Sequence, residues 1–155
     1  MVKNTSYKGK QDTVEDVKKA PKERHLTSKY NFCGPGTLYK LRKRGTYEKL
    51  MTAAGKTKVG TAPYGRPANK LDVACMAHDK VFGKVKASGN EVRAADKALI
   101  KRAQAISGNA SNSIKLRAQA GAVIAGIGGK VALEKAGLVR KGAFAAGGEK
   151  ESRLK

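Results

Sequence analysis

The sequence predicts a small all-α domain, with a core of two antiparallel helices between flexible basic arms. Residues 69–85 and 90–106 repeat apolar side chains at three- and four-residue steps, which is the spacing of one helical face. A short break at residues 88–90 separates these segments, and a short connection favours antiparallel packing. Strand patterns are scarce and aromatic residues make up only 5% of the chain, so the core has to be small.

The N-terminal residues 1–29 are polar and basic, with few large apolar side chains, and predict a flexible arm. The first twenty residues contain no apolar segment of the kind that a secretory signal requires. The longest uncharged stretch, residues 118–129, is well short of the roughly 20 residues needed to cross a bilayer. We therefore expect neither a signal peptide nor a transmembrane helix.

A loop, a basic helix and a turn-rich segment connect this arm to the helical core. The loop spans residues 30–36 and has glycines on both sides of Pro35. Residues 37–54 predict one basic amphipathic helix, which Gly45 weakens. Residues 56–67 are rich in Gly and Pro and predict turns.

The two core helices have recognisable starting residues, since Asn69 is placed to cap the first and Asn90 the second. Their apolar faces comprise Leu71, Ala74, Cys75, His78, Phe82 and Val85 in the first helix, and Val92, Ala95, Asp96, Leu99, Ala103 and Ile106 in the second. Residues 107–155 predict a Gly/Ala-rich basic tail. A further helix from Ile114 onward is opposed by several glycines, each costing about 1 kcal/mol relative to Ala.

His78 and Asp96 are chemically out of place on these apolar faces. A buried, unpaired carboxylate is costly, but each residue explains the other if the two helices pack antiparallel. The carboxylate of Asp96 would then fix one tautomer of His78 and leave its second ring nitrogen to accept a proton. Such a pair activates water and needs no nucleophilic side chain.

Asp79 follows His78 and points about 100° around the helix, toward a different neighbour. The 32–36 loop is the candidate neighbour, because its glycines can direct several backbone carbonyls at one point. Carbonyl oxygens with one carboxylate suit a hard cation such as Ca²⁺, although an ordinary Gly-Pro-Gly turn is the simpler reading of the loop alone.

Motifs with matching internal spacing occur in order along the chain: Phe32-Cys33-Gly34-Pro35-Gly36, then Arg66 to Asp72 leading into Asp72 to Phe82, then Ala95-Asp96-Lys97-Ala98. The first resembles the calcium loop of phospholipases A2. The others resemble the entry to the active-site helix of that family, the helix itself, and the helix that carries the Asp partner of its histidine. Residues 30–106 are thus similar to the phospholipase A2 family, most closely to the domains found in parvovirus capsid proteins.

The resemblance implies calcium-dependent hydrolysis of the sn-2 ester of glycerophospholipids. By position, His78 would deprotonate the attacking water and Asp96 would orient His78. The implied ligands of Ca²⁺ are the backbone oxygens of Phe32, Gly34 and Gly36 and the carboxylate of Asp79. The ion would polarise the ester carbonyl, and the amide of Gly34 would serve as a second oxyanion donor.

Cys33 and Cys75 permit at most one disulfide, and without a signal peptide the default expectation is reduced thiols. The resemblance adds that secreted phospholipases place a disulfide at these positions, whereas parvoviral domains generally lack it. A bridge would close a loop of about 43 residues and contribute roughly 4 kcal/mol in the chain-entropy model. Zinc held by Cys33, Cys75 and His78 is a third alternative, but it would consume the base.

The chain departs from the family pattern at three places. Phe82 stands where the family usually has Tyr, Thr37 replaces the Asn common in parvoviral loops, and residues 37–62 form a long insertion. None of these changes removes a primary catalytic group, but turnover could be slow.

The formal net charge of +21, from 33 Lys and Arg against 12 Asp and Glu, favours a polyanionic partner. As a phospholipase, the protein would bind an anionic phospholipid membrane, with Arg42, Lys43 and Arg44 as interfacial contacts. The resemblance places it in a virion that breaches a host membrane during entry. The alternative is a non-enzymatic basic virion protein on a worn phospholipase scaffold, which binds viral nucleic acid or capsid or perturbs a membrane.

Overall fold

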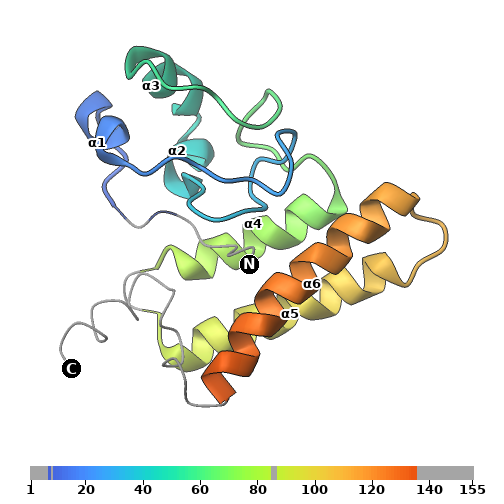
Figure 1. The fold of residues 1–155 in the computed structure, drawn as a ribbon. Helices are drawn as coiled ribbons and strands as arrows, with labels where there is room; N and C mark the ends of the chain where they lie inside the picture. The colour runs from blue at the N-terminus through green and yellow to red at the C-terminus, as the bar shows by residue number, and fades with distance from the viewer. Residues whose placement is uncertain (1–6, 8, 85–86, 136–155) are drawn as a thin grey trace.

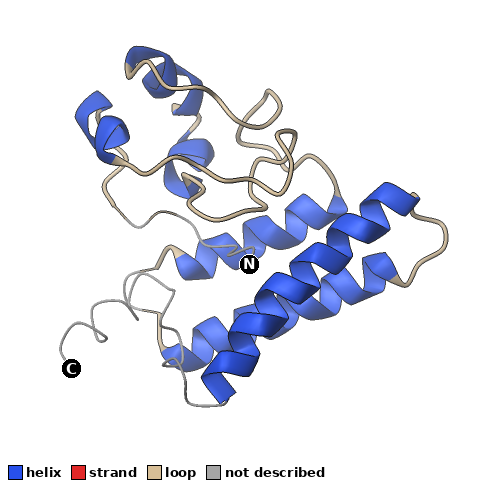
Figure 2. Ribbon diagram, in the orientation of Figure 1, coloured by secondary structure: helices blue, strands red, loops and turns tan. Residues whose placement is uncertain are grey.

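The computed structural model describes residue 7 and the ranges 9–84 and 87–135, and over these residues the chain is built of helices and loops (Figure 1 and Figure 2). The helices, in chain order, are α1 (Val14–Lys19), α2 (Tyr39–Arg44), α3 (Tyr47–Ala53), α4 (Lys70–Phe82), α5 (Gly89–Ser107) and α6 (Ile114–Lys135). The prediction of an all-α domain is confirmed. The remainder of both predicted arms, residues 1–6, 8 and 136–155, lies outside the described residues.

The three long helices α4, α5 and α6 form the main core, in which α5 packs against both α4 and α6 (Figure 1). The predicted antiparallel pair is α4 and α5. Helix α6 adds a third member, because it packs along α5 and buries Ala120, Val123 and Ile127. Residues 114–135 of the predicted tail therefore belong to the core, since burial of this face outweighs the helix cost of the glycines.

Loop residues complete this core from one side. The buried set comprises Tyr30, Phe32, Cys33, Leu71, Ala74, Cys75, Leu99, Ala103, Ile106, Ala120, Val123, Ile127 and Val131. Phe32 is fully buried, so the loop that carries it is packed into the helical layer.

A smaller layer of α1, α2 and α3 lies above the long helices in Figure 1. Its own apolar cluster contains Val17, Ala20, Leu38, Leu41, Tyr47 and Met51. Val17 is only 1% exposed, and α1 begins with a capping box between Thr13 and Asp16. The described part of residues 1–29 is thus packed against the insertion, whereas the sequence predicts a flexible arm. One buried turn is too short to give a clear helical repeat.

Gly45 divides the predicted helix of residues 37–54 into α2 and α3. Its backbone has φ 77° and ends α2 in the left-handed conformation, which glycine adopts without a Cβ penalty. The two short helices can therefore turn back on each other and enclose Tyr47 and Met51.

The ends of the long helices follow capping chemistry. The side chain of Asn69 accepts a hydrogen bond from the amide of Asp72, as predicted for the start of α4. Helix α5 starts earlier than the predicted cap at Asn90, because Ser88 and Glu91 form a reciprocal capping box.

Candidate active site

The structure brings together the two residues that the sequence marks as out of place. His78 on α4 and Asp96 on α5 are both buried, and the distance between His78 Nε2 and Asp96 Oδ1 is 2.7 Å. An ionised carboxylate only accepts hydrogen bonds, so the N–H group is at Nε2 and donates a hydrogen bond to Asp96 Oδ1. The antiparallel packing of α4 and α5 is what creates this contact.

The second nitrogen of His78 faces a different environment. Nδ1 is buried without a hydrogen-bond partner among the described residues, and it lies 4.0 Å from Asp79 Oδ1. The ring of Phe82, one turn along α4, packs against the imidazole with 4.2 Å between ring centroids. Burial alone would lower the pKa of His78, but the carboxylates of Asp79 and Asp96 outweigh it and raise this pKa above its usual value.

Asp79 is a buried carboxylate beside the 32–36 loop. Thr37, the residue after that loop, donates a hydrogen bond from Oγ1 to Asp79 Oδ2 at 2.7 Å. Burial raises the pKa of Asp79 to about 7, although the nearby His78 and the hydrogen bond from Thr37 act in the opposite direction. Thr37 thus supplies a polar partner to Asp79 at a position where the sequence departs from the family.

Two glycines of the 32–36 loop adopt positive φ angles. Gly34 and Gly36 have φ values of 137° and 76°, which only glycine adopts readily. The carbonyls of Cys33 and Pro35 accept hydrogen bonds from the backbone amides of residues 26 and 24, at 2.9 and 3.1 Å. The predicted ligand carbonyls at residues 32, 34 and 36 alternate with these two.

Asp72 anchors the loop to the start of α4. Its carboxylate accepts hydrogen bonds from the backbone amides of Asn31, Phe32, Cys33 and Ala68, at 2.8 to 3.0 Å. The sequence places Asp72 in the motif but gives it no role. A buried carboxylate six residues before the base therefore fixes where the loop begins.

A disulfide provides the second anchor. Cys33 and Cys75 are bonded in the structure and are 42 residues apart. Two oxidised cysteines do not offer thiolates, so the zinc alternative at Cys33, Cys75 and His78 does not apply to this state. The bridge ties the loop to α4 one turn before Asp79.

The types of donor at this site, backbone carbonyls and one carboxylate, are those that Ca²⁺ takes in proteins. Among the described residues, no group of three or more His, Cys, Asp or Glu side chains could hold a metal, so a cation here would depend on backbone oxygens. A buried carboxylate, glycines at positive φ and a doubly anchored loop supply that kind of donor set. A cation would also offset the cost of burying the charge of Asp79.

Removing the disulfide should destabilise the protein by about 4 kcal/mol, because the bridge closes a long loop in the unfolded chain. The variant is Cys33→Ser with Cys75→Ser, and the measurement is chemical unfolding under oxidising conditions. In excess reductant, the free energy of unfolding of the wild type should fall to that of the double variant. Equal stability of both proteins in oxidant would show that the bridge contributes nothing.

The prediction that Arg42 belongs to an exposed interfacial cluster is wrong, because Arg42 is buried. Its guanidinium is buried and donates from Nη2 to both carboxylate oxygens of Glu23, each at 3.0 Å. It also donates to Asn31 Oδ1 at 3.2 Å and to the carbonyl of Val59 at 3.0 Å. Arg42 is therefore an internal cross-link, and its buried guanidinium is not exposed for interfacial binding, contrary to the prediction.

Glu23 is the hub of this buried network. Besides Arg42, it accepts hydrogen bonds from the hydroxyl of Tyr47 at 2.7 Å and from the amide of Leu38 at 3.0 Å. Burial alone would raise the pKa of Glu23, but His25, Arg42 and Tyr47 outweigh burial and lower it to about 2. Sequence reasoning missed this residue. The available signal was that Glu23 is the only acid between Asp16 and Glu48.

The rest of the interfacial cluster remains a prediction. Lys43 and Arg44 are exposed, and Arg44 forms an ion pair with Asp12. Because Arg44 already has a carboxylate partner, Lys43 is the stronger of the two candidates for binding an external anion.

The fold and the site together define a small, disulfide-linked helical protein with a buried His–Asp pair beside a carbonyl-rich loop. The model of the phospholipase A2-like domain family matches residues 22–119, which is more than half of the sequence. The chain belongs to this family, which indicates a lipid esterase. The matched region extends beyond the predicted 30–106 domain at both ends and includes Glu23 and the start of α6. Searches of curated proteins and of solved structures found no match.

Proposed function

We propose that the protein is a calcium-dependent phospholipase A2 that hydrolyses the sn-2 ester of glycerophospholipids. The observation that carries this proposal is the arrangement of His78, with Nε2 held by Asp96 at 2.7 Å and Nδ1 buried beside Asp79. A base held in this way accepts a proton from water at Nδ1. Membership of the phospholipase A2-like family supports the choice of a phospholipid ester as substrate.

The residues divide the chemistry between them. His78 Nδ1 takes the proton of the attacking water, and Asp96 stabilises the imidazolium that forms and keeps the ring in place. Asp79 and the carbonyls of Phe32, Gly34 and Gly36 would hold Ca²⁺, and the bound ion would supply Lewis-acid stabilisation of the oxyanion. The amide of Gly34 donates to the same oxyanion. His78 then returns its proton to the leaving alcohol.

The proposed partner is a phospholipid membrane, with anionic lipids preferred because of the +21 charge. None of the described helices is both long and apolar enough to span a bilayer. The motif resemblance to parvoviral domains supports a virion protein that acts on a host membrane during entry.

Hydrolysis should require Ca²⁺ and stop in chelator. Asp79→Asn should raise the Ca²⁺ concentration needed for half-maximal activity by about tenfold or more, because an anionic ligand is lost. Mg²⁺ should substitute poorly, since it demands shorter and more regular coordination. The measurement is fatty acid release from phospholipid micelles across a calcium titration. Lys80→Ala, an exposed neighbour on α4, is the matched control.

Full activity in chelator would contradict the cation assignment. The absence of hydrolysis at every Ca²⁺ concentration, combined with tight nucleic-acid binding, would instead favour the non-enzymatic reading.

A further inference from the structure

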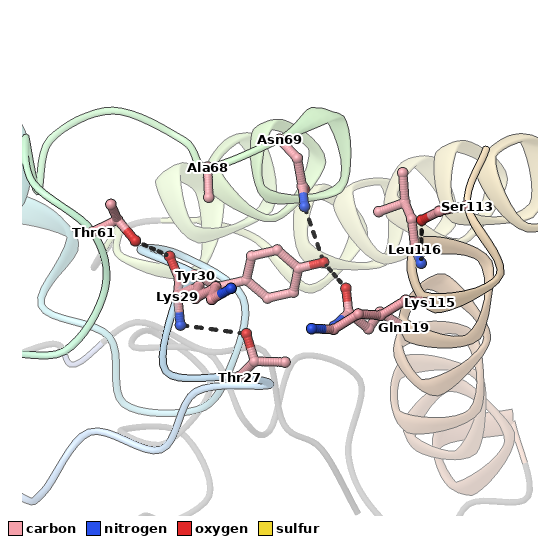
Figure 3. A pocket seen from close by; sticks show the side chains of 10 residues that line it. All are labelled: Thr27, Lys29, Tyr30, Thr61, Ala68, Asn69, Ser113, Lys115, Leu116 and Gln119. Atoms are coloured by element: carbon pink, nitrogen blue, oxygen red, sulfur yellow. Dashed lines mark hydrogen bonds between the residues drawn. The ribbon is translucent and has the colours of Figure 1, made fainter.

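A cavity of about 400 Å³ lies at the N-terminal ends of α4 and α6, away from the dyad (Figure 3). Its lining residues come from the 27–30 loop, from residues 61, 68 and 69, and from the first two turns of α6. His78 is nine positions after Asn69, which lines this cavity, and nine positions span about 14 Å along a helix. The cavity is therefore separate from the His78–Asp96 dyad.

The lining chemistry is cationic and rich in hydroxyl and amide groups. Lys29 and Lys115 both line the cavity, no acidic side chain does, and neither lysine has an ion-pair partner among the described residues. The hydroxyl of Tyr30 accepts a hydrogen bond from Asn69 Nδ2 at 3.1 Å and donates one to Gln119 Oε1, as Figure 3 shows. This bridge links the loop, α4 and α6 into one wall. Such a site favours an anion.

An exposed apolar side chain stands beside the cavity. Ile114, the first residue of α6, lies between Ser113 and Lys115, which both line the cavity, and it is 84% exposed. Ile114 is the most exposed large apolar side chain in the described part of the chain, well above Val73 at 45%. The first turn of α6 has no acid, and a cation there is unfavourable to the helix dipole, which an anion would relieve.

We propose that this cavity binds the phosphate of a membrane phospholipid headgroup, with Ile114 inserted among the acyl chains. Lys29 and Lys115 match the charge of the phosphate, and an adjacent apolar side chain is what distinguishes a membrane lipid from free phosphate. The selection of a phospholipid rests on the proposed function. The cavity, the unpaired lysines and the exposed isoleucine do not.

The test measures vesicle binding in chelator with His78→Ala as the background, so that neither hydrolysis nor calcium contributes. The vesicles contain equal parts of phosphatidylcholine and phosphatidylserine, at low salt. Lys29→Ala with Lys115→Ala should weaken binding by about thirtyfold, because two cations leave the membrane surface. Lys19→Ala with Lys49→Ala removes the same charge from exposed positions on α1 and α3, away from the cavity, and should weaken binding by less than about threefold.

Ile114→Ser separates a membrane lipid from free phosphate. It should weaken vesicle binding by about tenfold and leave the binding of inorganic phosphate unchanged, because only the apolar contact is lost. Thermal unfolding of each variant checks the fold, and these exposed positions should not alter it.

Equal losses in the two double variants would overturn the proposal, since the effect would then be one of overall charge. Unchanged vesicle binding by Ile114→Ser would also overturn it. Loss of duplex DNA binding in Lys29→Ala with Lys115→Ala, with vesicle binding intact, would assign the lysines to nucleic acid. Failure of hydrolysis in the wild type would count against the proposed function and would leave these binding results readable on their own.

Discussion

Replacing His78 with alanine should lower kcat/KM for phospholipid hydrolysis by about 10²- to 10⁴-fold, because the general base is lost. Asp96→Ala should cause a smaller loss, since the imidazole remains but is no longer held through Nε2 at 2.7 Å. Initial rates at saturating Ca²⁺ measure both effects. Lys97→Ala is the matched control, because Lys97 is exposed and adjacent to Asp96 on α5.

The double variant tests whether the two side chains act as one unit. If they do, His78→Ala with Asp96→Ala should be little worse than His78→Ala alone. Losses that multiply would show that the two residues contribute independently, and the dyad would have to be abandoned. A calcium titration of each variant should give an unchanged midpoint if Asp79 and the loop are undisturbed.

The dyad could be predicted from the sequence because its members break an otherwise regular pattern. His78 and Asp96 each occupy an apolar position of a well-formed helical repeat, and a short connection forces the two faces together. The start of α4 could also be predicted, because Asn69, a favourable capping residue, stands just before the apolar repeat. Local periodicity and a short connection are enough when the partners lie on consecutive helices.

The buried ion pair could not be predicted in this way. Arg42 lies among Lys40, Lys43 and Arg44, where hydropathy assigns every charge to the surface. Its partner Glu23 is 19 residues away, in a segment without a helical repeat. Which cation of such a run turns inward depends on tertiary packing of α2 against the residue 20–26 segment, and this is absent from local sequence.

The third core helix was underestimated for a related reason. Gly121, Gly126 and Gly128 lower the helix propensity of residues 114–135, so propensity alone argues for a tail. The burial of Val123 and Ile127 against α5 supplies the missing stabilisation. Tertiary contact overrode local preference, as it did for the single buried turn of α1.

Arg42→Ala should destabilise the protein by about 3–5 kcal/mol, which is the largest stability loss expected of any exchange in the insertion. Removing one partner leaves the Glu23 carboxylate buried without its main counter-charge. The same change frees Asn31 and Val59 from their hydrogen bonds to the guanidinium. Chemical unfolding at neutral pH measures the loss, and Lys43→Ala, exposed and adjacent, should stay within about 0.5 kcal/mol of wild type.

The pH dependence identifies the ion pair as the cause. Glu23 has its pKa lowered from 4.5 to about 2 in the folded protein, so its ionised form stabilises the fold above pH 4.5 and this stabilisation is lost as pH falls through 2. The shift corresponds to about 3 kcal/mol. Glu23→Gln with Arg42→Met removes both charges, and its stability should fall less steeply than that of wild type between about pH 5 and pH 2. Parallel pH profiles for the two proteins would show that other carboxylates govern acid unfolding. The Glu23–Arg42 ion pair would then contribute little to the stability of the fold.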